Sequence, residues 1–589
     1  MRSSNSVIVF FSALLTSCLA LSIAPQPRSI APQPDHYPTK CTNDQSRLCW
    51  DGKYDINTNY YTSGPRTGKT VRYNLELKNV TLSPDGIPTQ FLTINGQIPG
   101  PTLYANWGDT IEVHVTNKMH DNGTSIHWHG IRQLHTNKYD GANGVTECPL
   151  APGDTKVYRF VAEQYGTSWY HSHYSVQYGD GAWGAIHING PATSEYDIDL
   201  GTITLSEIYN QTAFQTGFIS QTIEPPQPIP ARNILINGTN VNVQNPSLGK
   251  RFQTTFTPGK KHRLRFINTA ADSVFVVSLD SHNMTVIQSD FVPIHPYTTD
   301  SISIAIGQRY DVIIDANQPV ASYWLRTVVQ TNCGETNDNT PELNLTGFIA
   351  YKGSKGLPTT NGPLPPTNQD CHDETQLVPY LPIQVPKTQL SSSDQSVVPM
   401  NVSGPVSDVN DLGDTVTRWR IHGASIDVDW TYPTLQQLKD HNRTKPSNPI
   451  FLDKAGYTYW IIENQFIANH PIHLHGHDFN IIYQSGVNAG PFDPNSAVLN
   501  FNNPPRRDVA TLAGNGSLVI AFNLDNPGAW LLHCHIAWHV SQGLSVQLIE
   551  RQQDIFKYTT LDNAWEKTCT NFKKWYPTSI YGPKDDSGI

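Results

Sequence analysis

The chain contains the stretch His533-Cys534-His535-Ile536, which is followed at a short interval by His539. Successive side chains of a β-strand point to opposite faces, so Cys534 would face one way and its two histidine neighbours the other. A soft thiolate could then bind one metal ion while the two imidazoles bind a second site behind it. Because covalent bonds alone would join the two sites, the stretch suits electron transfer between metals.

Three further segments of the chain are rich in histidine. A single His-x-His in a strand places both imidazoles on one face, but it is weak evidence on its own. Four such segments in one chain predict metal binding. Zinc usually occupies a closed site with four ligands, and one zinc ion would not need so many histidines and a cysteine. The three segments are His127-Trp128-His129-Gly130, His171-Ser172-His173 and His470-Pro471-Ile472-His473-Leu474-His475.

Two internal repeats predict the fold. A turn glycine, an alternating strand and an asparagine recur at 108–117, 259–268 and 456–464. A second pattern relates 166–173 to 528–535, and its middle counterpart at 322–325 keeps the aromatic residue but lacks histidine. Plentiful proline (43) and glycine (41) are typical of short strands and turns. We therefore expect an all-β protein of three consecutive β-sandwich domains, with metal in the first and third.

Composition gives the expected domain boundaries. A chain of 589 residues is long enough for several domains. Breaks near Asn189-Gly190-Pro191 and in the Gly/Pro/Thr-rich stretch 352–370 predict domains at 41–191, 192–370 and 371–589. The middle domain is expected to be a spacer and a wall of the substrate pocket. A short helix is expected at 564–574.

The N-terminus predicts secretion. Residues 1–20 combine Arg2, a short apolar run and a small-residue cleavage site, which is typical of a signal peptide. The apolar run is too short for a membrane anchor. Residues 21–40 contain a doubled Ser-Ile-Ala-Pro-Gln-Pro and suit a propeptide or a flexible tail.

Glycosylation sequons begin at Asn79, Asn122, Asn210, Asn237, Asn283, Asn344, Asn401, Asn442 and Asn515. A net charge of -10 without a basic cluster argues against nucleic-acid binding.

The cysteine count supports an oxidising compartment. Of eight cysteines, Cys18 leaves with the signal peptide and seven remain, an odd number. If Cys534 binds metal, the other six can form three disulfides, although their spacing does not settle the pairing. The expected pairs are Cys41–Cys49, Cys333–Cys371 and Cys148–Cys569.

The histidines divide into two ligand sets. A thiolate with two imidazoles is the ligand set of a blue-copper centre, and His470, Cys534 and His539 can supply it. Eight histidines remain and suit three copper ions at the interface of the first and third domains. His477 continues the alternation from His475, but it is not counted as a ligand because ten other histidines already complete the two ligand sets. The eight are His127, His129, His171, His173, His473, His475, His533 and His535.

These segments resemble the multicopper oxidases, and among them the laccases of ascomycete fungi, over nearly the whole chain after about residue 70. The resemblance implies cupredoxin-like Greek-key domains and four copper ions. It implies that His127 and His473 bind the type 2 copper, while His470, Cys534 and His539 bind the type 1 copper. The type 3 pair would be bound by His129, His171, His173, His475, His533 and His535.

The resemblance also implies an axial position of the type 1 copper at Leu544, ten residues after the cysteine. Leucine cannot ligate copper, and the missing donor would raise the redox potential. Ascorbate and bilirubin oxidases, which are similar to this chain, carry methionine there. The alternative interpretation is ordinary core packing, which is compatible with the first.

Further residues match the family in other roles. Asp140 matches an acid that relays protons to the cluster, or is an ordinary turn aspartate. Glu207 aligns with an acid that meets the phenol hydroxyl, or is a surface residue. The final residues resemble a tail that plugs the dioxygen channel, or form a frayed terminus. That tail is Asp586-Ser587-Gly588-Ile589.

The resemblance as a whole implies a secreted, monomeric laccase. Such an enzyme takes single electrons from phenols or aromatic amines and reduces dioxygen to water, with lignin degradation among its roles. Neither a membrane nor a nucleic acid is expected as a partner. A ferroxidase of the same fold is the nearest alternative, although it would need more carboxylates than Glu207 at the type 1 site. A non-catalytic copper or electron-transfer protein is more remote, because it needs only the blue site.

Overall fold

The computed structural model describes residues 42–223, 229–330, 347–365, 372–391, 393–410, 413–442, 447–581, 584 and 586–589. Every described residue lies in one compact unit, Lys40–Ile589. The expected signal peptide and the segment 21–40 lie outside the described residues. No helix in the described ranges combines the length and the apolar character needed to cross a membrane.

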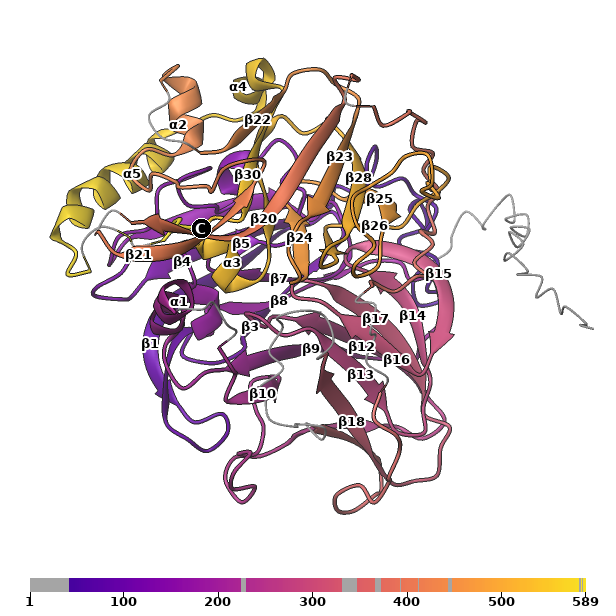
Figure 1. The fold of residues 1–589 in the computed structure, drawn as a ribbon. Coiled ribbons are helices and arrows are strands. Elements are labelled where there is room, and N and C mark those ends of the chain that lie inside the picture. The colour runs from indigo at the N-terminus through magenta and orange to yellow at the C-terminus, as the bar shows by residue number, and fades with distance from the viewer. Residues whose placement is uncertain are drawn as a thin grey trace, which may run out of the picture. The chain divides into compact units, whose positions relative to one another are not determined.

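The first part of the described chain forms two four-stranded sheets (Figure 1). Their orders are β2-β1-β4-β6 and β3-β8-β7-β5. The strands are β1 (Thr70–Leu82), β2 (Thr89–Ile94), β3 (Gly100–Asn106), β4 (Thr110–Asn117), β5 (His127–Trp128), β6 (Thr155–Val161), β7 (Gly166–His171) and β8 (Trp183–Asn189).

The middle part forms a six-stranded sheet, β10-β9-β12-β17-β14-β15, and a five-stranded sheet, β11-β19-β18-β13-β16. The strands are β9 (Ile198–Ile208), β10 (Asn233–Ile236), β11 (Phe252–Phe256), β12 (Lys261–Asn268), β13 (Phe275–Leu279), β14 (Met284–Ser289), β15 (Val292–Thr299), β16 (Ser301–Ile304), β17 (Arg309–Asp315), β18 (Ser322–Val329) and β19 (Gly347–Tyr351).

The last part repeats this arrangement, with sheets β21-β20-β23-β28-β25-β26 and β22-β30-β29-β24-β27. The strands are β20 (Val397–Val409), β21 (Thr415–Ile421), β22 (Pro449–Leu452), β23 (Tyr457–Asn464), β24 (His470–Leu474), β25 (Phe479–Gln484), β26 (Arg506–Arg507), β27 (Val509–Leu512), β28 (Ser517–Asn523), β29 (Gly528–Cys534) and β30 (Ser545–Glu550).

The two sequence repeats correspond to equivalent strands. The first repeat forms β4, β12 and β23. Each pairs parallel with the strand of its sheet that comes first in the chain, namely β1, β9 or β20. Each pairs antiparallel with its other neighbour in the sheet, namely β6, β17 or β28. The second repeat forms β7, β18 and β29, each paired antiparallel with the following strand. The expected all-β fold of three consecutive sandwiches is confirmed, while the exact domain boundaries stay predictions.

The strands that carry the predicted metal ligands are buried along their whole length. Strand β4 alternates between buried and half-buried residues, as expected where one face of a sheet packs on a core. In contrast, β5, β7, β24 and β29 are buried at every position. Both faces of these four strands are therefore covered, and the predicted ligands lie between packed parts of the molecule.

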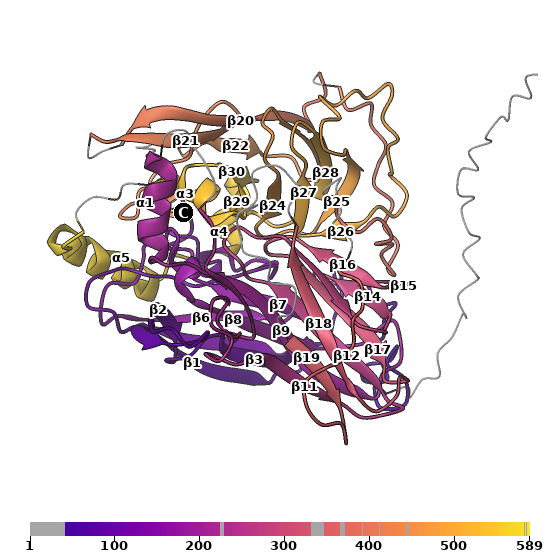
Figure 2. The same ribbon diagram turned by 60° about the horizontal axis from the view of Figure 1, so that its bottom comes forward.

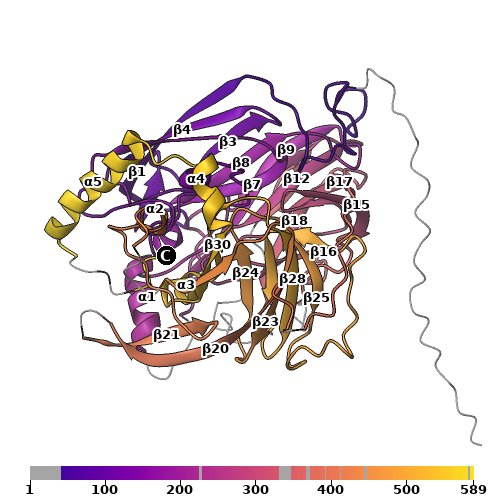
Figure 3. The same ribbon diagram turned by 90° about the horizontal axis from the view of Figure 1, so that it is seen from above.

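Helices cover the edges of the sheets. In Figure 2, α1 lies beside α3, and the two are in contact. The helix expected at 564–574 is confirmed as α5, which begins after Asp562, whose side chain accepts a hydrogen bond from the Trp565 N–H. Figure 3 shows α5 beside the strands of the first part. The α-helices are α1 (Ala213–Thr222), α2 (Thr434–Lys439), α3 (Ala537–Ser541), α4 (Ile555–Tyr558) and α5 (Asn563–Trp575).

A disulfide bond also links α5 to the first part of the chain. Cys148 and Cys569 form a disulfide that joins the first part of the chain to α5 across 421 residues of sequence. Cys49 is disulfide-bonded, and its expected partner Cys41 lies outside the described residues. The expected pair Cys333–Cys371 also lies outside them. Cys534 is a free, buried thiol.

Candidate metal centre

Two pairs of neighbouring strands carry the predicted metal ligands. In the first part of the chain, β5 pairs with β7 and sets His127 opposite His171. In the last part, β24 pairs with β29 and sets His473 opposite His533. Strands β7 and β29 correspond in the sequence repeat, and the histidine rings of the two strand pairs stack on one another at a common site. Cys534 is the next residue of β29 and faces the other side of that strand.

The imidazoles of the two parts interleave. The rings of His127 and His475 stack with their centroids 3.9 Å apart, and those of His129 and His473 stack 3.8 Å apart. Nδ1 of His129 lies 3.2 Å from Nε2 of His535. All eight predicted cluster histidines are at most 4% exposed, namely His127, His129, His171, His173, His473, His475, His533 and His535.

The ring nitrogens of this cluster suit metal ions. Nε2 of His127, His171 and His473 is buried and has no hydrogen-bond partner among the described residues. Nε2 of His475 and Nε2 of His533 face each other at 3.2 Å. A buried nitrogen with a lone pair and no donor is costly unless a cation binds it. The donor set therefore fits metal ions held between the two strand pairs.

A second ligand set lies on the other side of β29. Sγ of Cys534 lies 3.5 Å from Nδ1 of His470 and 3.6 Å from Nδ1 of His539. The two nitrogens are 3.1 Å apart. Leu544 is fully buried, and its carbonyl accepts a hydrogen bond from the Cys534 N–H at 3.1 Å. One soft sulfur with two imidazoles is the donor set of a blue-copper centre.

A tryptophan that the sequence did not single out packs on this second set. The Trp419 ring centroid lies 4.9 Å from that of His470 and 4.4 Å from that of His539. His470 and Cys534 are 0% exposed, whereas His539 is half-buried. The imidazole of His539 is thus the part of this ligand set that reaches toward solvent.

Burial governs the protonation of these ligands. It lowers the pKa of His473 and His535 well below the ordinary value of 6.5, and repulsion from neighbouring imidazoles lowers it further. Burial also lowers the pKa of His533 to about 4 and that of His539 to about 3. These four imidazoles are therefore neutral at pH 7 and able to bind metal. Burial raises the pKa of the Cys534 thiol, so a cation is required to hold the thiolate.

Asp140 lies against two cluster histidines. Its Oδ2 is 2.8 Å from Nδ1 of His475, and its Oδ1 is 3.3 Å from Nδ1 of His127. The next residue, Gly141, has a φ of 85°, and a Cβ there would lie 1.9 Å from the carbonyl oxygen of Ile126. Asp140 therefore occupies a tight turn and also contacts the cluster.

One acid at the cluster was not expected from the sequence. Asp508 lies between β26 and β27, is fully buried, and has its Oδ1 3.1 Å from Nε2 of His129. Its partner is Arg309, which begins β17 in the middle part of the chain. The available signal was the charged run Arg506-Arg507-Asp508 directly before an apolar strand, since buried charges require partners.

Glu207 is buried, so the surface interpretation of this residue does not hold. It is 5% exposed and accepts hydrogen bonds from the hydroxyl of Tyr209 at 2.7 Å, the N–H of Asp272 at 2.6 Å and the hydroxyl of Ser273. Burial raises the pKa of Glu207 above its ordinary value, although these donors oppose the rise. The preceding loop residue Ala271 accepts a hydrogen bond at 2.8 Å from the first N–H of α3, which carries His539.

The C-terminal tail, residues 586–589, is buried beside both ligand sets. The hydroxyl of Ser175, two residues after His173, donates a hydrogen bond to Asp586. The N–H of Ser587 donates to the carbonyl of Ser541, two residues after His539, at 2.7 Å. The last residue is 1% exposed. The tail is therefore packed into the molecule rather than frayed.

A thiolate site joined to a buried histidine cluster within three β-sandwiches defines a copper-binding oxidoreductase. Residues 76–193, 199–354 and 425–554 match family models described as multicopper oxidase. A laccase from Cryphonectria parasitica is 41% identical, covering 98% of this chain and 100% of that protein. The chain therefore belongs to the multicopper oxidase family.

Further relatives agree with this result. Laccase-2 from Botryotinia fuckeliana is 42% identical and covers 99% of this chain and 100% of that protein. The crystal structure of a laccase from Botrytis aclada matches with a TM-score of 0.83 at 44% identity, covering 92% of this chain and 99% of that one. Fet3p, a multicopper oxidase that functions in iron import, matches with a TM-score of 0.76 at 26% identity, covering 86% and 95%. The sandwiches are cupredoxin-like, as in these structures.

Proposed function

We propose that this protein is a laccase, which takes one electron at a time from phenols and aromatic amines and reduces dioxygen to water. The observation that carries the proposal is the covalent link between Cys534, beside His470 and His539, and the cluster histidines on either side of it. Similarity to fungal laccases over nearly the full chain supports the choice of substrate class.

The proposed complement is four copper ions, which supply the one-electron redox chemistry and the reduction of dioxygen when bound. His470, Cys534 and His539 would hold the type 1 ion, and His127 and His473 the type 2 ion. The buried, unpartnered ring nitrogens support this assignment. The type 3 pair would be held by His129, His171, His173, His475, His533 and His535.

The backbone of β29 gives electrons a short route between the two sites. Cys534 lies between His533 and His535 in sequence, so only peptide and side-chain bonds separate the thiolate from each neighbouring imidazole. Because His539 is the half-buried ligand, a phenol can approach the type 1 site at its ring edge. Leu544, buried and without a donor atom, would leave the axial position unligated and raise the potential.

Two acids are proposed to handle protons. Asp140, in contact with His475 and His127, would deliver protons to the cluster as dioxygen is reduced. Glu207, beside the loop that contacts α3, would accept the proton that a phenol releases with its electron. Residues 586–589 would plug the channel to the cluster, which their burial beside Ser175 and Ser541 supports.

A ferroxidase is the second candidate because the chain is similar to Fet3p. Ferrous iron is bound by carboxylates that solvent can reach. The acids beside the type 1 site, Glu207 and Asp272, are each 5% exposed, and Glu207 already accepts three hydrogen bonds. This favours an aromatic donor over a metal ion.

Oxygen uptake by the copper-loaded protein tests the proposal, with dimethoxyphenol, ferrous iron and ascorbate supplied in parallel. We expect preference for the phenol, with water rather than peroxide as product. Preference for iron would replace the laccase assignment by a ferroxidase. A blue protein that consumes no oxygen with any donor would support the non-catalytic alternative.

We also propose that the protein is secreted and monomeric. The eight predicted glycosylation asparagines among the described residues are all exposed or half-buried, which leaves them compatible with glycans. Peptide mapping of the protein from culture medium would locate the mature N-terminus and the occupied sequons. Size-exclusion chromatography with light scattering would measure the mass, and a dimer would contradict the proposal.

A further inference from the structure

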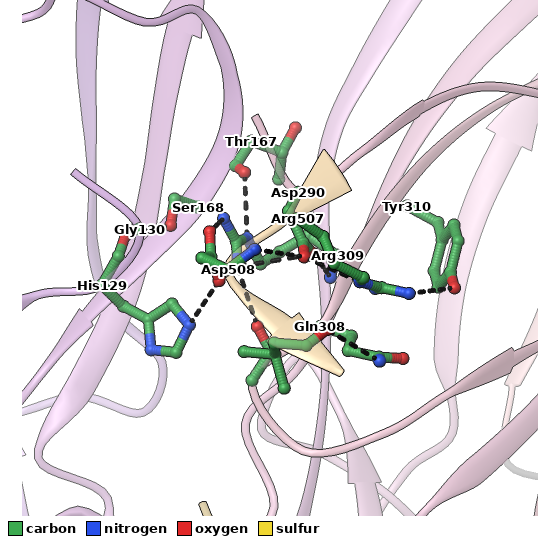
Figure 4. Close-up of polar contacts among 12 residues, drawn as sticks. His129, Gly130, Thr167, Ser168, Asp290, Gln308, Arg309, Tyr310, Arg507 and Asp508 are labelled. Atoms are coloured by element: carbon green, nitrogen blue, oxygen red, sulfur yellow. Dashed lines mark hydrogen bonds and ion pairs between the residues drawn. The ribbon is translucent and has the colours of Figure 1, made fainter. Parts of the chain in front are cut away.

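Asp508 is the point at which three parts of the chain meet beside the cluster (Figure 4). Its Oδ1 accepts a hydrogen bond at 2.6 Å from Nη1 of Arg309, and its Oδ2 accepts one at 2.6 Å from Nη2. Arg309 belongs to the middle part, which contributes no predicted copper ligand. Both side chains are fully buried. The two parallel hydrogen bonds hold the carboxylate in one orientation.

The carboxylate selects the tautomer of one predicted ligand. Oδ1 of Asp508 lies 3.1 Å from Nε2 of His129, and a carboxylate can only accept, so Nε2 carries the proton. The other nitrogen, Nδ1, is then unprotonated and faces Nε2 of His535 at 3.2 Å. The bond therefore directs the lone pair of His129 into the cluster.

The backbone of the same residue selects the tautomer of a second ligand. The carbonyl of Asp508 lies 2.8 Å from Nδ1 of His473, so Nδ1 donates and Nε2 keeps its lone pair. That Nε2 is buried and has no partner among the described residues. The rings of His129 and His473 stack at 3.8 Å with an angle of 10°. Asp508 thus holds two stacked imidazoles, from different parts of the chain, in opposite tautomers.

Two glycines allow this close approach. A Cβ at Gly130 would lie 2.5 Å from both Nη2 of Arg309 and Oδ2 of Asp508. A Cβ at Gly307 would lie 3.0 Å from ring carbons of His129 and His535. Both glycines have positive φ, 73° and 83°. The middle part therefore reaches the ligands directly, through a turn that a larger residue would push away.

A second ion pair, between Arg507 and Asp290, contacts the first one. Arg507 donates to Oδ2 of Asp290 at 3.0 Å, and the N–H of Asp508 lies 3.3 Å from the same oxygen. The N–H of Arg309 donates to Oδ1 of Asp290 at 2.9 Å. Two arginines and two aspartates balance in charge, so each buried charged group has an opposite charge beside it.

We propose that Asp508, held by Arg309, is a positioning residue that keeps His129 and His473 in the tautomers required to bind cluster copper. The inference rests on the proposed copper sites. The middle part of the chain then controls the cluster without supplying a ligand. The competing interpretation is that the Arg309–Asp508 pair only joins the domains.

A matched pair elsewhere separates the two interpretations. Arg326 donates to Asp280 through Nε at 2.5 Å and Nη2 at 2.9 Å, and both side chains are almost fully buried. This pair lies in the same middle part of the chain and, within the described residues, contacts no predicted copper ligand. Asp280→Asn therefore removes a comparable buried ion pair and leaves the cluster untouched.

The experiment compares Asp508→Asn, Arg309→Lys and Asp280→Asn with the wild-type copper-loaded protein. Each is measured for copper per chain, for the blue absorbance of type 1 copper, for the electron paramagnetic resonance of type 2 copper, and for melting temperature. Asp508→Asn keeps the size of the side chain but cannot accept two hydrogen bonds from Arg309. Arg309→Lys keeps the positive charge and loses the paired donors, and it is the milder change.

We expect both cluster variants to keep the blue absorbance and to lose type 2 copper, with affinity for cluster copper or turnover reduced about 10- to 100-fold. Asp280→Asn should lower the melting temperature and keep the type 2 signal. A wild-type signal and copper content in Asp508→Asn would overturn the inference, as would equal loss of type 2 copper in Asp280→Asn. If Asp508→Asn does not fold, Arg309→Lys decides on the same criteria.

The result is independent of substrate preference. If the wild-type protein preferred ferrous iron to phenols, the laccase assignment would fail, while the type 2 signal of the variants would still test Asp508.

Discussion

Oδ2 of Asp140 lies 2.8 Å from Nδ1 of His475, although 335 positions separate the two residues in sequence. The contact joins the first and last parts of the chain at the predicted cluster. A carboxylate that accepts a hydrogen bond from a metal ligand can orient that ligand and can also exchange protons with the site.

Asp140→Asn should therefore slow dioxygen reduction by about 100-fold, because an amide cannot take up and release a proton. Rapid mixing of the reduced protein with dioxygen measures this step. Anaerobic reduction of the blue site by a phenol should be unchanged. Asp109→Asn, which alters another buried aspartate of the first part, is the control. Wild-type reoxidation in Asp140→Asn would remove the proposed relay.

Leu544→Met should lower the redox potential of the type 1 site. A thioether offers an axial donor that stabilises the oxidised ion, and Leu544 is fully buried next to Cys534. Redox titration of the blue absorbance gives the potential. Leu548→Met, at a fully buried leucine within β30, controls for the change in packing. A potential unchanged in Leu544→Met would argue against the axial position.

Deletion of residues 586–589 should speed the loss of copper to a chelator, because it removes buried chain beside Ser175 and Ser541. The type 2 signal followed over time in the presence of the chelator measures this rate. Asp586→Asn keeps the chain in place and separates the effect of the carboxyl group from that of the plug. Equal copper loss and equal kinetics in the deleted and intact proteins would show that the tail does not gate the site.

Glu207→Gln should change the pH dependence of phenol oxidation. Burial raises the pKa of Glu207 above 4.5. As the pH increases through that raised pKa, the wild-type side chain loses its proton and becomes a proton acceptor, so kcat/KM should rise. Glutamine cannot titrate, so the acidic limb should disappear and kcat/KM should stay low. A pH profile from 4 to 8 with a methoxyphenol tests this, and an unchanged profile would exclude the role.

The same pKa has an opposite consequence for stability. Above pH 4.5 the unfolded chain has lost the proton that folded Glu207 still holds, so the free energy of unfolding falls as the pH rises through this window. Glu207→Gln should remove that part of the dependence. Glu374, another acid whose pKa burial raises, provides the control. Glu374→Gln should share the effect on stability and leave the phenol profile intact.

Much of the fold and of the site could be predicted because their signals are local. The alternation of β4 and the helix α5 appear in short stretches of sequence. The histidine pairs belong to strands whose period of two places them on one face. His171 and His533 occupy corresponding positions of a repeat that occurs twice in the sequence.

Other features have no local signal. Asp508 contacts Arg309, which is 199 positions away in sequence, and the residues around either one do not indicate the contact. The burial of Glu207 could not be predicted from its neighbours, because two of its three donors, Asp272 and Ser273, are 65 and 66 positions away in sequence. The terminal residues resembled a plug, but their burial depends on hydrogen bonds to Ser175 and Ser541.

The types of ligand and the repeated sandwich could be predicted from the chain alone, because side-chain chemistry and strand alternation are properties of a few consecutive residues. Tertiary structure alone decided which nitrogen of His129 and of His473 faces the cluster, since the tautomer depends on where a distant carboxylate and carbonyl come to rest. It also decided that the middle part reaches the site, because the contact of Arg309 with Asp508 exists only after the sandwiches have packed together.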